Sequence, residues 1–146
     1  MDDTYKHKGQ RKKLVEAIAR KGITDTRVLE AIGAVPRHLF VESYLENRAY
    51  DDNALPIAAG QTISQPYTVA YQTQLLQVAP GHSVLEIGTG SGYQAAVLLE
   101  MGANVFTIER QRRLFASTGE LLKKLNYRPK AFYGDGYKGL PAHRPF

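Results

Sequence analysis

An acidic residue and three glycines stand at a spacing that could hold a nucleotide-like ligand. Glu86 is followed by Gly88, Gly90 and Gly92, with small hydroxyl residues between the glycines. Glycine suits a tight turn because it adopts positive φ and lets a ligand approach bare backbone. A helix start beyond such a turn offers unpaired N–H groups. We therefore expect a ligand site here, the alternative being a glycine-rich turn without a ligand.

The segments around these glycines predict a strand, a turn, a helix and a second strand. Residues 83–87 read SVLEI, with an apolar core that favours a strand, residues 92–101 favour a helix, and residues 104–109, NVFTIE, read as the next strand. In an open parallel sheet, ligands bind at the carboxyl ends of the strands. Glu109 ends the second strand, about 20 residues past the glycines, where an acid accepts hydrogen bonds from ribose hydroxyls.

The glycine spacing narrows the type of ligand. The dinucleotide fingerprint is G-x-G-x-x-G, but here Tyr93 occupies the third glycine position. An NAD-dependent dehydrogenase is therefore the less favoured alternative. The form E-x-G-x-G-x-G resembles motif I of S-adenosylmethionine-dependent methyltransferases. This resemblance implies cofactor contacts by Glu86, Gly88, Thr89, Gly90, Gly92 and Glu109. Glu86 would face the methionine end of the cofactor, the alternative being a carboxylate that only holds loop N–H groups.

Further segments resemble the protein-L-isoaspartate O-methyltransferase family, from about Arg20 onward. They read VPRH at 35–38, LPI at 55–57, GQTISQP at 60–66 and GDG at 134–136. The GQTIS segment is the most specific, because many methyltransferases share motif I without it. The resemblance implies an α/β, Rossmann-like methyltransferase fold, with a parallel sheet that is incomplete here and an N-terminal helical extension.

The resemblance also implies a reaction. A methyl group would pass from S-adenosylmethionine to the carboxylate of L-isoaspartyl residues in damaged proteins or peptides, with D-aspartyl residues as a further candidate. S-adenosylhomocysteine would be the product. No general base is needed, because a carboxylate with a pKa of about 4 is already ionised at neutral pH. The alternatives are another carboxylate substrate or a non-catalytic fragment of such an enzyme.

The same resemblance assigns roles in the acceptor segment. It implies substrate binding by Gln61, Thr62, Ile63 and Ser64, with Ser64 as the catalytic residue, whose hydroxyl helps to hold the acceptor carboxylate. Ser64 lacks the G-x-S-x-G context of a nucleophile. The alternative is that Ser64 caps a helix that begins near Pro66.

A third glycine-containing segment follows the predicted strand 130–133. The resemblance implies cofactor contacts by Gly134, Asp135 and Gly136, with the Asp135 carboxylate accepting a hydrogen bond from the adenine amine. The composition G-D-G also suits a tight turn without a ligand.

The length and composition set limits on the class of protein. We expect 146 residues to form one domain, with a helical extension and substrate loop over 1–80 and the cofactor core over 81–146. The family continues through further strands, so we expect a truncated enzyme. The chain has no cysteine, which fits a reducing compartment. It has no apolar leader and no apolar run long enough for a membrane span, so we expect a cytoplasmic protein that binds no membrane.

The net charge is +5, and much of it lies in the N-terminal segment. We interpret this run as a solvated helix face or a frayed terminus, with nucleic-acid binding as the alternative that we do not favour. His38 is expected to be structural, and no His, Asp or Glu cluster has the spacing of a metal site.

The remaining pattern predicts several helices and one exposed strand edge. Helices are expected at 10–21, from Thr24 or Asp25 onward, at 38–45, at 66–78 and at 112–125, with an ordered loop over 47–63. The strand at 83–87 would have a neighbour on one side only. An open apolar edge pairs readily with another chain, so we expect an edge-paired or strand-swapped dimer.

Overall fold

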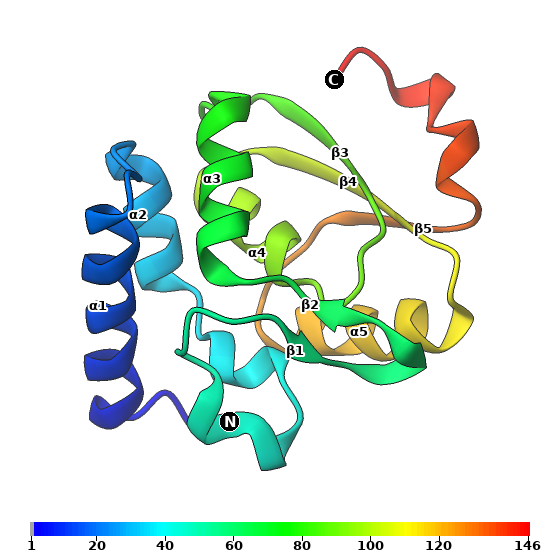
Figure 1. Cartoon of the computed structure of the whole chain (residues 1–146). Helices are drawn as coiled ribbons and strands as arrows, with labels where there is room; N and C mark the ends of the chain where they lie inside the picture. Colours follow the sequence, from blue (N-terminus) through cyan, green and yellow to red (C-terminus); the bar gives the residue numbers. More distant parts are fainter. Residues whose placement is uncertain (1) are drawn as a thin grey trace.

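The computed structural model describes residues 2–146 and has an α/β fold. Figure 1 shows a helical layer at one end of the molecule and a twisted sheet at the other. The helices are α1 (Tyr5–Arg20), α2 (Thr26–Ala34), α3 (Pro66–Leu76), α4 (Tyr93–Glu100) and α5 (Arg112–Lys124). The strands are β1 (Leu55–Pro56), β2 (Thr62–Ile63), β3 (Ser83–Ile87), β4 (Asn104–Glu109) and β5 (Lys130–Tyr133).

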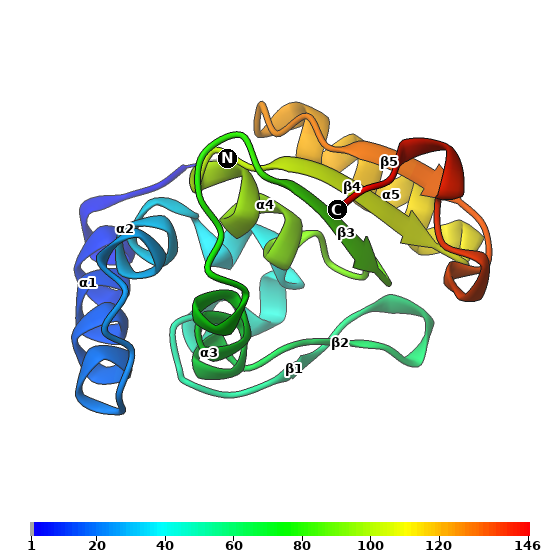
Figure 2. The same ribbon diagram turned by 90° about the horizontal axis from the view of Figure 1, so that it is seen from above.

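The main sheet is parallel, with the order β3-β4-β5. The crossover helices α4 and α5 connect its strands, as the alternation of apolar runs and helical stripes predicts. Because the strands are parallel, their carboxyl ends all lie at the same end of the sheet, its carboxyl edge. Figure 2 shows the short antiparallel pair β1 and β2 beside this edge. Within the described chain, β3 has β4 on one side and no strand on the other, as predicted.

Both faces of the central strand β4 are covered. Val105 belongs to the buried apolar core that the helices share. Phe106, which points to the opposite face, contacts the rings of His143 and Phe146 at centroid distances of 5.2 and 5.4 Å. The C-terminal segment therefore folds over the face of the sheet that the helices leave open, as a parallel strand requires.

Helix α1 begins at Tyr5, five residues before the predicted start at Gln10. Thr4 caps it: the Thr4 hydroxyl accepts from the His7 backbone N–H, and the His7 ring accepts from the Thr4 N–H. This reciprocal cap stabilises the first turn of the helix. The polar residues of that turn show no apolar periodicity, so the sequence did not predict it. At α2 the cap is Asp25, whose side chain accepts from the Arg27 N–H.

The predicted helix over 38–45 is wrong. Two 3₁₀ helices stand there instead, Arg37–Phe40 and Ser43–Arg48. Val41 between them is extended, with φ −116° and ψ 161°. Valine is β-branched, which restricts its χ1 angle and lowers its helix propensity. The extended Val41 therefore separates two short helices, each of which buries an apolar side chain, Phe40 and Leu45.

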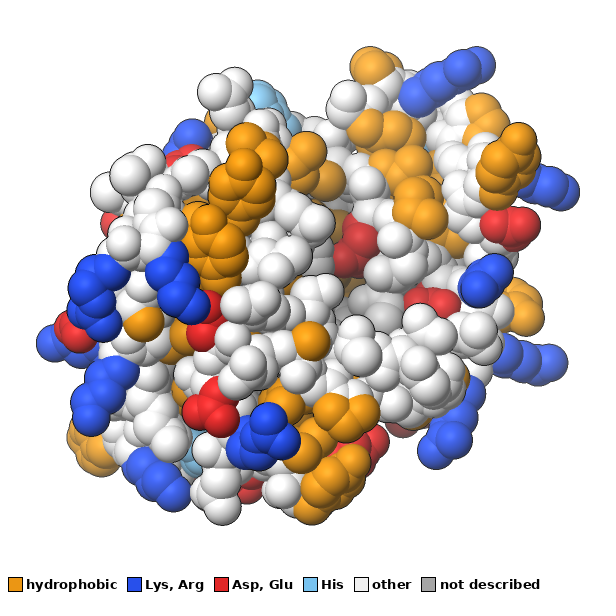
Figure 3. Space-filling view, in the orientation of Figure 1, with side chains coloured by type: hydrophobic (Ala, Val, Ile, Leu, Met, Phe, Trp, Pro, Cys, Tyr) orange, Lys and Arg blue, Asp and Glu red, His pale blue; other side chains and the backbone are white. Residues whose placement is uncertain are grey.

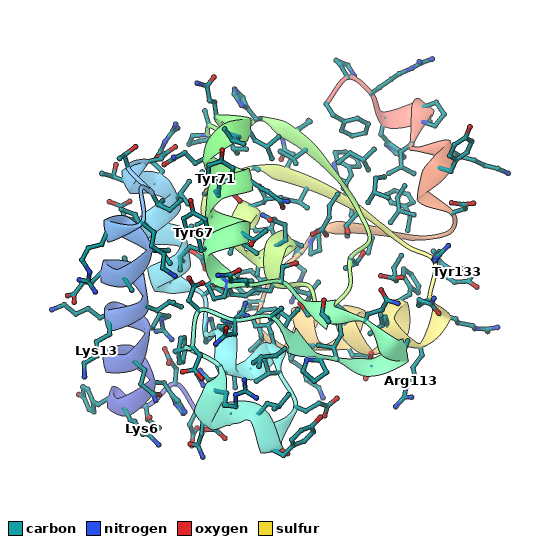
Figure 4. All side chains as sticks on the ribbon, viewed as in Figure 1. Lys6, Lys13, Tyr67, Tyr71, Arg113 and Tyr133 are labelled. Carbon is teal, nitrogen blue, oxygen red and sulfur yellow. The ribbon has the colours of Figure 1, made fainter. Side chains whose placement is uncertain are left out.

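The basic N-terminal run is an ordered helix with one buried member. Arg11 is buried, donates to both carboxylate oxygens of Asp3 at 3.0 and 2.8 Å, and also donates to the Gly33 carbonyl. Burial opposes the charge of Arg11, but its hydrogen bonds to Asp3 and Tyr50 outweigh this effect and raise the pKa of Arg11. Figure 4 shows Lys6 and Lys13 on the outer side of α1.

In the described part of the chain, no helix has the length and apolar character of a membrane span.

Candidate functional site

The glycine turn joins β3 to α4 in a conformation that other residues rarely adopt. The φ angles of Gly88, Gly90 and Gly92 are +89°, +54° and +84°. A Cβ atom on Gly92 would lie 2.8 Å from the Cγ2 of Thr118, closer than real contacts allow. The N–H groups of Gly88 and Thr89 both donate to the carbonyl of Ile108 in β4. The turn is therefore fixed by the neighbouring strand and helix.

Two adjoining hollows surround this turn, with volumes of about 230 and 200 Å³. They share Thr62, Gly88 and Gly90 in their walls. The first is also lined by Ile63, Ser64, Val69, Gln72, Glu86, Ile87, Thr89, Ser91, Tyr93 and Gln94. The second is also lined by Gln61, Ile108, Glu109, Arg110, Gln111 and Gly136. Figure 3 shows a hollow in the middle of this face with acidic side chains in it.

Glu86 lies in the first hollow, at the carboxyl end of β3. Its Oε1 accepts a 2.6 Å hydrogen bond from the hydroxyl of Thr107 in β4. Burial of the carboxyl raises its pKa to about 8, the Thr107 hydrogen bond opposes this shift, and the charge of Glu109 adds to it. No loop N–H bond to the Glu86 carboxylate is present among residues 2–146, so the carboxylate does not hold the loop in that way.

Glu109 lies in the second hollow and is 4% exposed. One carboxylate oxygen accepts from the Gly90 N–H and the other from the Gln111 N–H, each at 2.8 Å. Each oxygen has a further lone pair for a ligand hydroxyl. Glu109 therefore fixes the glycine turn and also offers acceptors to the hollow. Glu86 and Glu109 thus line adjoining hollows that share Gly88 and Gly90 in their walls.

The acceptor segment forms the wall opposite the glycine turn. All four predicted residues, Gln61, Thr62, Ile63 and Ser64, line one or both hollows. The alternative that Ser64 caps α3 is wrong: Gln65 holds the N-cap position, and Asp52 accepts the hydrogen bond from the first-turn Tyr67 N–H at 2.8 Å. A residue distant in sequence thus performs the capping and leaves the Ser64 side chain exposed.

Arg37 links this acceptor segment to the helical layer. Its guanidinium is fully buried and donates to the carbonyls of Ala49, Asn53 and Ser64 at 2.8, 3.2 and 3.0 Å. It also lies 4.7 Å from the ring centroid of Tyr93, the first residue of α4. Burial lowers the pKa of Arg37. One buried cation thus contacts both the loop and the helix that follows the glycine turn.

Three predicted cofactor residues lie outside the walls of the hollows. Gly92 packs beneath the turn, against Thr118 and Leu122. Gly134 extends the sheet by donating to the carbonyl of Glu109. Asp135 is exposed, and its carboxylate accepts from the Tyr137 N–H at 3.0 Å. The adenine contact of Asp135 stays a prediction, beside the local turn that its hydrogen bond already makes.

Several residues of the site were not predicted from the sequence. Gln72 from α3 and Gln94 from α4 both line the first hollow. Thr107 is fully buried in β4 and bonds to both Glu86 and Thr89. The signal available for Thr107 is a hydroxyl among the apolar residues Val105, Phe106 and Ile108 of the strand. For the glutamines the sequence offers no signal, because their helix faces are set by packing.

Asp3, His7 and His38 bring possible metal ligands within 4.8 Å of one another. The two imidazole rings are stacked, however, with centroids 3.7 Å apart and planes at 11°. Stacked rings direct their nitrogen lone pairs in parallel planes, so both cannot point at one ion. His38 already bonds to Tyr50 and to the Asp2 carbonyl. The cluster is explained by these hydrogen bonds, which give His38 a structural role.

A parallel sheet whose first strand ends in an acid and a glycine turn, with a second acid at the end of the next strand, is the Rossmann-like arrangement that binds a nucleotide-type ligand. The family model described as protein-L-isoaspartate(D-aspartate) O-methyltransferase matches residues 9–146. The chain belongs to this family, which uses S-adenosylmethionine to methylate isoaspartyl residues.

Individual relatives agree with this membership. The chain is 58% identical to a protein-L-isoaspartate O-methyltransferase of Christiangramia forsetii and 60% identical to that of Flavobacterium johnsoniae. Each match covers the whole chain and 69% of the relative.

Two solved structures have the same fold. A protein-L-isoaspartate O-methyltransferase superimposes with a TM-score of 0.82 at 29% identity, over 93% of this chain and 45% of that one. A putative enzyme of the same name from Plasmodium falciparum, solved in complex with S-adenosyl-L-homocysteine, gives 0.68 at 26% identity, over 85% of this chain and 62% of that one. The chain thus spans about half to two thirds of these structures.

Proposed function

We propose that the two hollows form one S-adenosylmethionine site and that the chain takes part in methyl transfer to isoaspartyl carboxylates. The observation that carries the proposal is the pair of acids, Glu86 and Glu109, in two hollows that share the glycine turn. Glu86 would accept from the ammonium group of the methionine end, and Glu109 from the ribose hydroxyls. A nearby ammonium group favours the ionised carboxylate, which offsets the raised pKa of Glu86.

The acceptor would enter along the segment Gln61–Ser64. Its carboxylate oxygen attacks the sulfonium methyl carbon, the carbon–sulfur bond breaks, and neutral S-adenosylhomocysteine leaves. Both reactants carry their charges beforehand, so the protein contributes alignment and the exclusion of water. The Ser64 hydroxyl, which does not cap α3, is available to orient the acceptor carboxylate. This is consistent with a site lined by hydroxyl, amide and backbone groups.

Asp135 and Gly134 complete the proposed site at its adenine end. For Asp135 to accept from the adenine amine, its second carboxylate oxygen must be used, since the first accepts from Tyr137. Gly136, which lines the second hollow, brings this turn against the end of β3.

The second candidate function, methylation of a different small carboxylate, differs from the first only in the acceptor.

Two measurements test this proposal. Titration calorimetry with the 146-residue chain should detect binding of S-adenosylhomocysteine and none of NAD, and tighter binding of NAD would contradict the cofactor assignment. A methyl-transfer assay should then compare an isoaspartyl peptide with the same peptide containing ordinary aspartate. Transfer to both peptides at equal rates would contradict the acceptor assignment while leaving the cofactor site in place. Cofactor binding without any transfer would favour the non-catalytic alternative.

We also propose an edge-paired or strand-swapped dimer through β3. A hollow of about 590 Å³ lies along the open edge of this strand, lined mainly by apolar residues, among them Leu76, Val84 and Phe146. Unpaired backbone groups beside apolar side chains attract another strand. The proposed partners are therefore damaged proteins and a second copy of the chain, without nucleic acid or membrane. The proposed location is the cytoplasm, since the sequence contains no cysteine.

A further inference from the structure

Thr107 contacts both the acid and the glycine turn of the first hollow while lying outside its walls. It occupies the interior of β4, opposite Glu86 in the register of the sheet, and is 0% exposed. Its hydroxyl donates to Glu86 Oε1 at 2.6 Å and lies 2.6 Å from the hydroxyl of Thr89. Three side chains from two strands and the turn thus form one short chain.

The chemistry of these groups sets the donor-to-acceptor direction of the hydrogen-bond chain. An ionised carboxylate only accepts hydrogen bonds, and a hydroxyl has one hydrogen to donate. Thr107 gives its hydrogen to Glu86, so the Thr89 hydroxyl must donate to Thr107. The lone pairs of Thr89 then remain free toward the glycine turn. If Glu86 is protonated, its O–H can donate to Thr107 instead, and the whole chain reverses.

Few charged groups oppose or support this arrangement. From β4, Glu109 repels the Glu86 charge. From α3 and α4, the neighbours in the first hollow are the neutral side chains of Gln72, Gln94 and Tyr93, and burial raises the pKa of Tyr93 to about 12. No cationic side chain from residues 2–146 lines that hollow. The Thr107 hydroxyl is therefore the protein group that favours the ionised form of Glu86.

We propose that Thr107 is a positioning residue of the cofactor site, whose hydroxyl donates to the Glu86 carboxylate, favours its ionised form and orients the hydroxyl of Thr89. The part that concerns the cofactor rests on the proposed function. The hydrogen-bond chain itself exists in the ligand-free protein and is testable there.

The first experiment follows the carboxyl ¹³C signal of Glu86 against pH in the ligand-free chain, with the signal assigned by Glu86→Gln. Thr107→Val keeps the β-branched shape but removes the donor, so the titration midpoint should rise by about one to two pH units. Thr107→Ser should restore it. Ser117→Ala is the control, because the Ser117 hydroxyl bonds to the Arg113 carbonyl in its own helix and lines neither hollow. The titration midpoint of Glu86 should not change in this control variant.

The second experiment measures the affinity for S-adenosylhomocysteine by calorimetry at pH 7.5 and 9.5. Thr107→Val should weaken binding roughly tenfold at pH 7.5 and less at pH 9.5, where a larger share of Glu86 is ionised in the variant. An unchanged midpoint in the first experiment, or an equal loss of affinity at both pH values, would overturn the proposal. If Thr107→Val does not fold, Thr89→Val breaks the other end of the chain and should also raise the midpoint. Absence of binding by the unaltered protein would refute the proposed function. The ¹³C titration would still test the hydrogen-bond chain from Thr89 through Thr107 to Glu86.

Discussion

The guanidinium of Arg37 donates a 3.0 Å hydrogen bond to the carbonyl of Ser64. The two residues are 27 positions apart, one in a 3₁₀ helix of the helical layer and the other in the acceptor segment. The bond directs the Ser64 backbone inward and leaves its hydroxyl exposed at the first hollow. The N-terminal helical layer thereby fixes the wall at which the acceptor is proposed to bind.

Replacing Arg37 should therefore loosen the acceptor segment and destabilise the protein. A lysine keeps the charge but cannot reach the three carbonyls that Arg37 contacts. We expect Arg37→Lys to lower the free energy of unfolding by about 1.5–3 kcal/mol, the range for hydrogen bonds to charged groups. Urea denaturation measures this. Arg113→Lys on the exposed side of α5 (Figure 4) is the control and should change stability by less than about 0.5 kcal/mol. Equal effects of the two substitutions would contradict the role of Arg37.

Removing the Ser64 hydroxyl should affect turnover and spare the cofactor. An orienting hydrogen bond worth about 1.4–2.8 kcal/mol corresponds to a 10- to 100-fold lower rate. We expect Ser64→Ala to lower methyl transfer to an isoaspartyl peptide by this factor, in whichever form of the chain is active. Its affinity for S-adenosylhomocysteine should be nearly unchanged. Full activity of the alanine variant, or a covalent intermediate trapped on Ser64, would disprove the orienting role.

Gly92 should not tolerate a methyl group. Its φ is +84°, and an added Cβ would lie 2.8 Å from Thr118 and 3.1 Å from Leu122. We expect Gly92→Ala to cost about 1–3 kcal/mol of stability, from overpacking and backbone strain together. Gly119→Ala is the matched control in α5, where nothing lies within 4 Å of the new Cβ, and should stabilise the helix by up to about 1 kcal/mol. Thermal unfolding of both variants would show whether the turn is as tightly packed as the geometry indicates.

The raised pKa of Glu86 has a consequence for stability. The folded-state pKa of about 8 lies above the ordinary value of 4.5, so the folded protein binds more protons than the unfolded chain between these values. The contribution of Glu86 is therefore fully present below about pH 4.5 and is lost as the pH rises to about 8. We expect Glu86→Gln to be more stable than the unaltered chain at pH 8, with a smaller difference at pH 5. Urea unfolding at the two pH values tests this, and a larger gain at pH 5 would contradict the assigned direction.

The open edge of β3 should govern the oligomeric state of the 146-residue chain. Light scattering after size-exclusion chromatography should detect a dimer or larger species. Ile87 is 57% exposed at the end of this edge strand, and a lysine there should oppose pairing. We expect Ile87→Lys to shift the chain toward the monomer. A monomeric unaltered chain at high concentration would refute the proposed dimer.

The sequence determined the elements of the cofactor core. The strand before Gly88, the helix after Gly92 and the strand that ends in Glu109 were all predicted within one or two residues. Their signals are local: an apolar run of strand length, glycines that require positive φ, and a helical stripe. The order of these elements also fixes a parallel sheet, because crossovers are right-handed and short. The family followed from the GQTIS segment, which is local as well.

The tertiary structure decided which side chains meet. Asp52 caps α3 from the loop before it, Arg37 bonds to Ser64 across 27 residues, and Thr107 joins Glu86 to Thr89. None of these contacts follows from spacing along the chain, because each depends on the register of β3 against β4 or on how the helical layer packs. Burial also sets the pKa of Glu86, and burial is a property of the folded chain. Local propensity thus gave the elements of the site, while packing between distant segments gave the site its hydrogen bonds and its charge state.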